Sequence, residues 1–122
     1  MKNIILIDDE NTLRESMADL LEVIGHKVDS YPSIHSAMMN SDLAMYDVVI
    51  CDVGLPGEDA FLFAQTIKES FTQHSFILLS AFSERETIQR GIEAGADHYL
   101  VKPPSVEELE SAINNLNPHS YA

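Results

Sequence analysis

Five short apolar segments alternate along the chain with longer segments of helical periodicity, and this alternation most restricts the fold. Four of the five are apolar almost throughout, as expected of strands buried on both faces, whereas 27–31 alternates like an edge strand. Strands that alternate with helices form a parallel sheet covered on both faces. The expected strands are 4–7, 27–31, 48–51, 76–79 and 98–101.

Helical stripes fill the intervals and extend beyond the fifth strand, so five helices are expected. Three of their starts fit a Ser/Thr-x-x-Glu capping box, namely Thr12 to Glu15, Ser83 to Glu86 and Ser105 to Glu108. Gly25 and Gly95 are expected at helix C-termini. The apolar stripes comprise Leu13, Met17, Leu20, Leu21 and Ile24; Ile34, Ala37 and Met38; Ala60, Ala64, Ile67 and Phe71; residues of 83–94; and Val106, Leu109, Ala112, Ile113 and Leu116.

The composition limits the classes of partner. Seven Lys and Arg residues face twenty Asp and Glu residues, a formal net charge of -13. Such a charge argues against direct binding of nucleic acid and against an anionic membrane surface. No segment approaches the roughly 18 apolar residues of a membrane span, and no signal-peptide pattern opens the chain, so we expect a cytoplasmic protein. The single cysteine, Cys51, lies in an apolar run and is expected to be a small buried side chain.

The carboxyl ends of the expected strands carry the chemically interesting residues. Right-handed crossovers give a doubly wound sheet, in which ligands bind at these ends. The run 48–51 stops at one carboxylate, and burying an unpaired carboxylate costs several kcal/mol. The residues that follow the first, third, fourth and fifth strands are Asp8-Asp9, Asp52, Ser80-Ala81 and Lys102-Pro103.

These residue types suit phosphoryl transfer assisted by a metal ion. Three clustered carboxylates repel one another unless a cation neutralises them, and oxygen ligands without His or Cys favour Mg²⁺. A lysine and a hydroxyl can contact phosphoryl oxygens, and one aspartate can serve as the nucleophile. Each residue has an ordinary explanation alone, since Lys-Pro is commonly a turn and acids are common before helices. Their coincidence on one predicted edge favours a functional site.

Four motifs make the chain similar to the receiver domain of two-component response regulators over about residues 2–116. They are Ile-Asp-Asp-Glu after the first strand, Asp-Val-Gly-Leu-Pro-Gly after the third, Leu-Leu-Ser-Ala after the fourth, and Ala-Gly-Ala-Asp-His-Tyr-Leu-Val-Lys-Pro across the fifth. The resemblance implies a flavodoxin-like α/β sheet of order 2-1-3-4-5. It also implies a cis bond between Lys102 and Pro103.

The resemblance further implies a signalling switch, not an enzyme, that assists its own Mg²⁺-dependent phosphorylation and dephosphorylation. A histidine kinase or histidine phosphotransfer protein would supply the phosphoryl group. A changed surface on the last two helices would then meet a partner or output domain. The resemblance implies that Asp52 is the phosphoacceptor. Asp9, Asp52 and the carbonyl of Gly54 would bind Mg²⁺ directly, and Asp8 would bind it through water. Lys102, Ser80 and the N–H of Ala81 would contact the phosphoryl group, and the Tyr99 ring would fill the space left by Ser80.

Several positions depart from the family pattern. Ala60 stands where a glycine is usual, which would cost about 1 kcal/mol if a positive φ were required there. Pro104 replaces an aromatic or apolar residue, and Gly54 and Phe82 occupy the places that tune access of water to the phosphoryl group. The last helix contains no Lys or Arg, which argues against a dimer joined by salt bridges through the last two helices.

Two other classes of function compete with the switch. A receiver-like scaffold would bind its partner without phosphorylation, but such a scaffold is expected to lack a key acid, the lysine or the hydroxyl. An aspartate-nucleophile phosphatase would need a second acid two residues after Asp52, where Gly54 stands, and a cap insertion for which the chain has no room. We expect one domain over 1–117, with 118–122 as a tail or the start of a linker.

Overall fold

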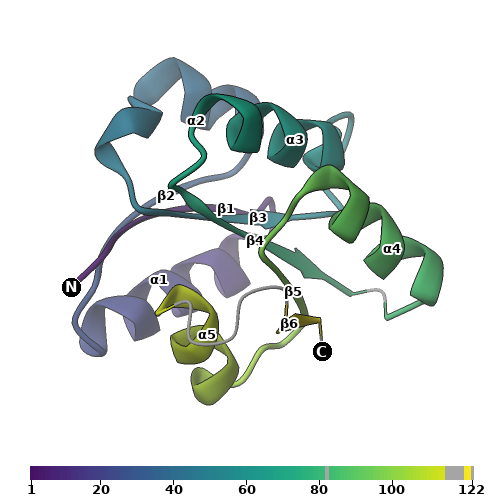
Figure 1. The fold of residues 1–122 in the computed structure, drawn as a ribbon. Helices are drawn as coiled ribbons and strands as arrows, with labels where there is room; N and C mark the ends of the chain where they lie inside the picture. Colours follow the sequence, from purple (N-terminus) through teal and green to yellow (C-terminus); the bar gives the residue numbers. More distant parts are fainter. Residues whose placement is uncertain (82, 115–119, 122) are drawn as a thin grey trace.

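The computed structural model describes residues 1–81, 83–114 and 120–121. A single parallel sheet of strand order β2-β1-β3-β4-β5-β6 lies between two layers of helices (Figure 1). This confirms the predicted α/β architecture and the order 2-1-3-4-5 of its first five strands. The strands are β1 (Asn3–Ile7), β2 (Lys27–Tyr31), β3 (Val48–Asp52), β4 (Ser75–Ser80), β5 (His98–Val101) and β6 (Ser120–Tyr121).

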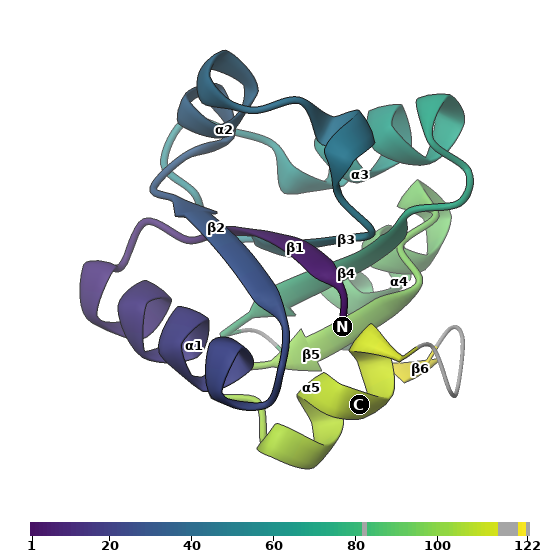
Figure 2. The ribbon, with the colours of Figure 1, turned by 90° about the vertical axis from the view of Figure 1, so that its left-hand side faces the viewer.

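The helices are α1 (Asn11–Val23), α2 (Ile34–Asn40), α3 (Ala60–Ser70), α4 (Arg85–Ala94) and α5 (Val106–Ile113), with a 3-10 turn η1 (Leu43–Met45). Figure 1 shows α2, α3 and α4 on one face of the sheet and α1 and α5 on the other. Figure 2 shows the same two layers from the side, with α1 and α5 next to each other. None of the described helices is both long and apolar enough to cross a membrane.

The pleat of the strands divides the core into two clusters. Ile5 and Ile7 of β1 face α2, α3 and α4, whereas Ile4 and Leu6 face α1 and α5. Every residue of β3 is buried, including Asp52 at its carboxyl end. Strands buried on both faces explain why the sequence shows continuous apolar runs there and not alternation.

Two helix caps differ from the predictions, and two other helix ends agree with them. The side chain of Glu10, not Thr12, caps α1 by accepting a hydrogen bond from the Leu13 N–H. The cap residue of α4 is Glu84, which leaves Ser83 one position too early to reach the first-turn N–H groups. The capping box of Ser105 and Glu108 is confirmed, and Gly95 ends α4 in the left-handed region at φ 90°.

The apolar stripes are confirmed with one exception. Met38 of α2 is 37% exposed, because this short helix turns only Ile34 and Ala37 toward the core. Ala60 begins α3 in ordinary helical conformation and is buried, so the cost of a positive φ does not arise there. The predicted Leu116 of the last helix and Phe82 lie outside the described residues.

Strand β6 has no signal in the sequence. Ser120 and Tyr121 pair in parallel with His98 and Tyr99 of β5. The pairing uses backbone groups, which any residue supplies. No apolar run or periodicity therefore marks this two-residue strand in the sequence.

Candidate functional site

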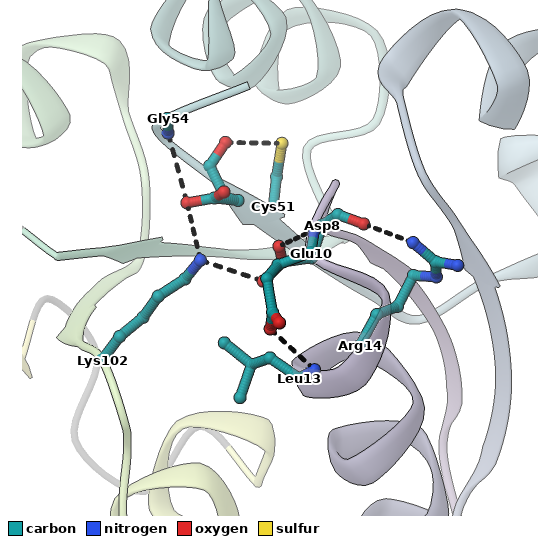
Figure 3. A network of polar contacts seen from close by, with 8 residues as sticks. Asp8, Glu10, Leu13, Arg14, Cys51, Gly54 and Lys102 are labelled. Atoms are coloured by element: carbon teal, nitrogen blue, oxygen red, sulfur yellow. Dashed lines mark hydrogen bonds and ion pairs between the residues drawn. The ribbon is translucent and has the colours of Figure 1, made fainter. Parts of the chain in front are cut away.

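Three charged side chains meet at the carboxyl edge of the sheet. The Nζ atom of Lys102, just beyond β5, lies 3.0 Å from Oδ2 of Asp8 and 3.1 Å from Oδ1 of Asp52 (Figure 3). Asp8 is fully buried and Asp52 is 5% exposed. One lysine therefore faces two buried carboxylates, and the group carries a surplus negative charge.

Asp9 adds a third carboxylate, and this one is exposed. Asp8, Asp9 and Asp52 offer oxygen atoms that all lie within 4.8 Å of one another. Oδ2 of Asp8 is ion-paired with Lys102 and has no other polar partner among the described residues, so it retains acceptor capacity. An oxygen-only ligand set with surplus negative charge at an open rim fits Mg²⁺.

The turn from β1 into α1 is held by three hydrogen bonds around Asp8 (Figure 3). The Glu10 N–H donates to Oδ1 of Asp8 at 3.0 Å, and the Glu10 carboxylate accepts from the Leu13 N–H at 2.7 Å. The Arg14 guanidinium donates to the carbonyl oxygen of Asp8 at 2.8 Å. Both the side chain and the backbone of Asp8 are thereby fixed before any ligand binds.

Glu10 and Arg14 are site residues that the sequence analysis missed. A signal for Arg14 was available, since a cation in the first turn of a helix is unfavourable beside the positive end of the helix dipole. Such a placement indicates a specific local acceptor. Glu10 gave no comparable signal, because acids are common before helices.

The loop after β3 leaves Asp52 open on one side. The Gly54 N–H donates to Oδ1 of Asp52 at 3.1 Å. A side chain at Gly54 would begin 3.8 Å from one carboxylate oxygen and 3.9 Å from the other. Because glycine has no side chain, nothing from this position covers the Asp52 carboxylate.

Burial and charge shift the ionisation of the central pair. Burial raises the pKa of Asp52, and the Gly54 N–H and Lys102 oppose this rise only in part. Burial alone would lower the pKa of Lys102, but Asp8 and Asp52 outweigh it and raise that pKa above its usual value. The lysine therefore stays charged while Asp52 resists ionisation, which marks Asp52 as the energetically costly group of the cluster.

Ser80, at the end of β4, and Tyr99, in β5, form a second part of the site. Both are fully buried, and the Tyr99 hydroxyl and the Ser80 side chain share a hydrogen bond. Burial raises the pKa of Tyr99, and Ser80 lowers it in part. The carbonyl oxygen of Ser80 also accepts from the Lys102 N–H at 2.8 Å, so the two parts are joined through the backbone. Ala81, the next residue, is exposed.

Two further expectations concern neighbours of the site. Cys51 is free and fully buried, as predicted, and burial raises the pKa of its thiol. The bond between Lys102 and Pro103 is cis. Of the predicted site residues, Tyr99 lies within β5, whereas the others end or follow their strands at the carboxyl edge of the sheet.

Comparison with known proteins then identifies the family. The response regulator receiver domain family matches residues 4–114. The chain belongs to this family. The two-component response regulator PhoP of Pseudomonas aeruginosa is 30% identical over 113 residues, which cover 93% of this chain and 50% of that protein. The KDP operon transcriptional regulatory protein KdpE of Escherichia coli is 30% identical over 121 residues, which cover 98% of this chain and 53% of that protein.

Solved receiver structures share the fold. A response regulator receiver domain protein from Clostridium thermocellum has a TM-score of 0.85 at 28% identity, with 94% of this chain and 93% of that chain covered. The response regulator TrrA from Thermotoga maritima, in complex with Mg²⁺ and BeF, has a TM-score of 0.79 at 28% identity over 96% of this chain and all of that one (100%). The receiver spans about half the length of PhoP and KdpE.

Membership of the receiver family identifies the general kind of function. Receiver domains are signalling switches that bind Mg²⁺ at an acidic pocket, which here is Asp8, Asp9 and Asp52. They interact with histidine kinases and output domains.

Proposed function

We propose that this receiver accepts a phosphoryl group on Asp52 from a histidine kinase or histidine phosphotransfer protein. The observation that carries the proposal is the buried Asp52 carboxylate, paired with Lys102 and flanked by Asp8 and Asp9. A buried group that resists ionisation is an expensive feature, and a fold retains it where reaction requires it.

In the proposed reaction a carboxylate oxygen of Asp52 attacks the phosphorus atom of the donor. The P–N bond to the donor histidine breaks, a P–O bond to Asp52 forms, and the released imidazole nitrogen keeps the electron pair and later takes up a proton. Lys102 lies 3.1 Å from Asp52 and is therefore close enough to contact the negatively charged phosphoryl oxygens once they are bound to Asp52. The hydroxyl of Ser80 and the N–H of Ala81 are proposed as further donors to these oxygens.

Magnesium would be held by Asp9, Asp52 and the carbonyl of Gly54 directly and by Asp8 through water. When bound, it neutralises the charge of the phosphoryl oxygens. The donor set supports this assignment, since it contains only oxygens and Asp8 Oδ2 retains acceptor capacity. For dephosphorylation, the open side at Gly54 would admit a water molecule that attacks phosphorus while Asp52 leaves.

Signal output is proposed to run through Ser80 and Tyr99 to the surface of α4 and α5. A partner protein or an output domain would read that surface in the cytoplasm, where histidine kinases present their phosphoryl groups. The net charge of -13 makes direct binding of nucleic acid by this chain unfavourable. Any such binding would belong to the partner or output domain.

Acetyl phosphate with Mg²⁺ tests the acceptor. We expect covalent phosphorylation of the wild type and of the control Asp19→Ala, which removes an exposed acid on α1, but none of Asp52→Ala. Label that persists in Asp52→Ala would refute the assignment of the acceptor. A wild type that takes up no label from acetyl phosphate or a phosphohistidine donor would favour the phosphorylation-independent scaffold.

A Mg²⁺ titration followed by NMR tests the metal ligands separately. We expect Asp9→Ala to bind Mg²⁺ at least about tenfold more weakly than the wild type, because a direct ligand is lost. The Asp19→Ala control keeps the affinity. An unchanged affinity in Asp9→Ala would exclude this residue as a ligand.

A further inference from the structure

The middle of α4 approaches the sheet through a residue without a side chain. Gly91 is the one residue of α4 that is buried, and it lies against Leu78 of β4 and Tyr99 of β5. Glycine is a poor helix former compared with alanine, so a glycine inside a helix needs a reason. At Gly91 the reason is that the side chains of the sheet leave little room for a Cβ atom.

A Cβ atom at Gly91 would make unusually tight contacts with two side chains of the sheet. It would lie 3.1 Å from Cδ2 of Tyr99 and 3.2 Å from Cδ1 of Leu78. Ordinary carbon contacts are about 3.5–4.0 Å, so a methyl group would displace the ring, the leucine or the helix. Leu78 is fully buried in the packed core, which leaves little room for it to yield.

The aromatic ring against Gly91 belongs to the candidate site. Tyr99 is fully buried beneath α4, and its hydroxyl is hydrogen-bonded to Ser80. The carbonyl of Ser80 in turn accepts from the Lys102 N–H. A line of direct contacts therefore runs from Gly91 through Tyr99 to the Ser80 hydroxyl at the end of β4.

We propose that Gly91 is a positioning residue of the switch. By leaving room for the Tyr99 ring beneath α4, it keeps the hydrogen bond between Tyr99 and Ser80, and this bond holds the Ser80 hydroxyl ready for the phosphoryl group. The inference rests on the proposed function and extends it to α4. Any displacement of α4 along this line also changes the helix surface that a partner would meet.

The test is the affinity for beryllium fluoride in saturating Mg²⁺, measured by NMR for Gly91→Ala. We expect the affinity to fall at least about fivefold, the lower end of typical coupling between sites. The matched control is Glu93→Ala, which adds the same helix-forming residue at an exposed position of α4. It is expected to bind as the wild type does, because position 93 is exposed and lies outside the line of contacts from Gly91 to Ser80.

A double-mutant cycle with Tyr99→Ala tests the route. If Gly91 acts through the ring, Gly91→Ala should cause no further loss of affinity in the Tyr99→Ala background. Leu78→Val removes the second tight contact, and we expect it to restore part of the affinity of Gly91→Ala. This rescue also keeps the test available if the single variant is poorly folded.

Two results would overturn the inference. One is that Gly91→Ala binds beryllium fluoride as tightly as Glu93→Ala does. The other is that Gly91→Ala lowers the affinity equally in the wild-type and Tyr99→Ala backgrounds. Failure of the proposed function itself looks different, because then the wild type would not bind beryllium fluoride or would bind it equally well as Asp52→Ala.

Discussion

Lys68 and Lys102 each form an ion pair with aspartate in a partly buried position, but the two clusters differ in charge balance. Lys68 of α3 lies 2.9 Å from Oδ2 of Asp97, which precedes β5, and also donates to the His74 carbonyl at 2.7 Å. The same Asp97 oxygen accepts from the Phe76 N–H at 2.7 Å. One cation, one anion and two backbone groups satisfy one another.

Lys102 faces two aspartates and has Asp9 nearby, so its cluster is short of positive charge. The balanced cluster at Lys68 joins α3 to the start of β4 and β5 and needs nothing more. The unbalanced cluster lies at the carboxyl edge of the sheet and is completed only by a further cation. Charge balance thus separates an ion pair that stabilises the fold from one that forms a site.

Removal of Lys102 is expected to have the largest effect on stability. Lys102→Ala leaves two buried carboxylates without a counter-ion, which we expect to cost about 3 kcal/mol of unfolding free energy in Mg²⁺-free buffer. Because Mg²⁺ binds the folded acids, it should restore part of this loss. Urea denaturation with and without Mg²⁺ measures both, with the exposed Lys27→Ala as control. A loss that Mg²⁺ does not reduce would contradict the view of an unbalanced site.

Removal of Asp97 is expected to cost about 2 kcal/mol, because the Phe76 N–H and Lys68 both lose a partner. In contrast to Lys102→Ala, this loss should be the same with and without Mg²⁺. The same denaturation curves decide the point. Rescue of Asp97→Ala by Mg²⁺ would remove the distinction between the two clusters.

Neutralising one aspartate in each cluster is expected to give effects of opposite sign. Burial raises the pKa of Asp52, so its ionised form destabilises the fold at neutral pH, and Asp52→Asn should stabilise it by about 1 kcal/mol without Mg²⁺. Asp97→Asn should destabilise it, since its charge is balanced by Lys68. Thermal melting in chelator-treated buffer measures the change in Tm of each variant. Changes of the same sign would contradict the distinction between the Lys102 and Lys68 clusters.

The smallest expected effect is a pH dependence of the Asp52 contribution. The folded pKa of Asp52 lies above its unfolded value, so the folded protein binds the proton more tightly, and the penalty appears as pH rises through this range. The advantage of Asp52→Asn over the wild type should therefore shrink, by less than about 1 kcal/mol, between about pH 7 and about pH 4. Urea titrations of both proteins at each pH measure it. A constant difference would mean that Asp52 titrates normally.

The sequence predicted most of the fold because apolar runs and helical stripes are local consequences of burial. It failed where neighbouring residues compete for one role and where the extent of the core decides. Thr12 and Ser83 fit a capping pattern, but the Glu10 side chain caps α1, and α4 begins after Glu84. Met38 fits a helical stripe, but the core does not extend to its side of the short α2.

The site residues also divide into those that local sequence patterns predict and those that only the folded structure reveals. That Asp8, Asp9, Asp52 and Lys102 share one edge could be predicted from the rule that parallel strands present their carboxyl ends together. The first-turn position of Arg14 indicates a local acceptor, but that this acceptor is the Asp8 carbonyl could not be predicted, since it depends on how α1 turns away from β1. Nor could the fit of Gly91 against Tyr99, because residue spacing does not say which helix residue touches which ring.

By itself, the sequence determined the order of elements, the layers of the sheet and the edge at which the acids gather, since periodicity and chain direction suffice for these. Only the tertiary structure decided which carboxylates share Lys102, how deeply each is buried, and which helix positions contact the Ser80–Tyr99 pair. Distances of about 3 Å between residues far apart in the chain set charge balance and packing, and such distances exist only once the strands have paired.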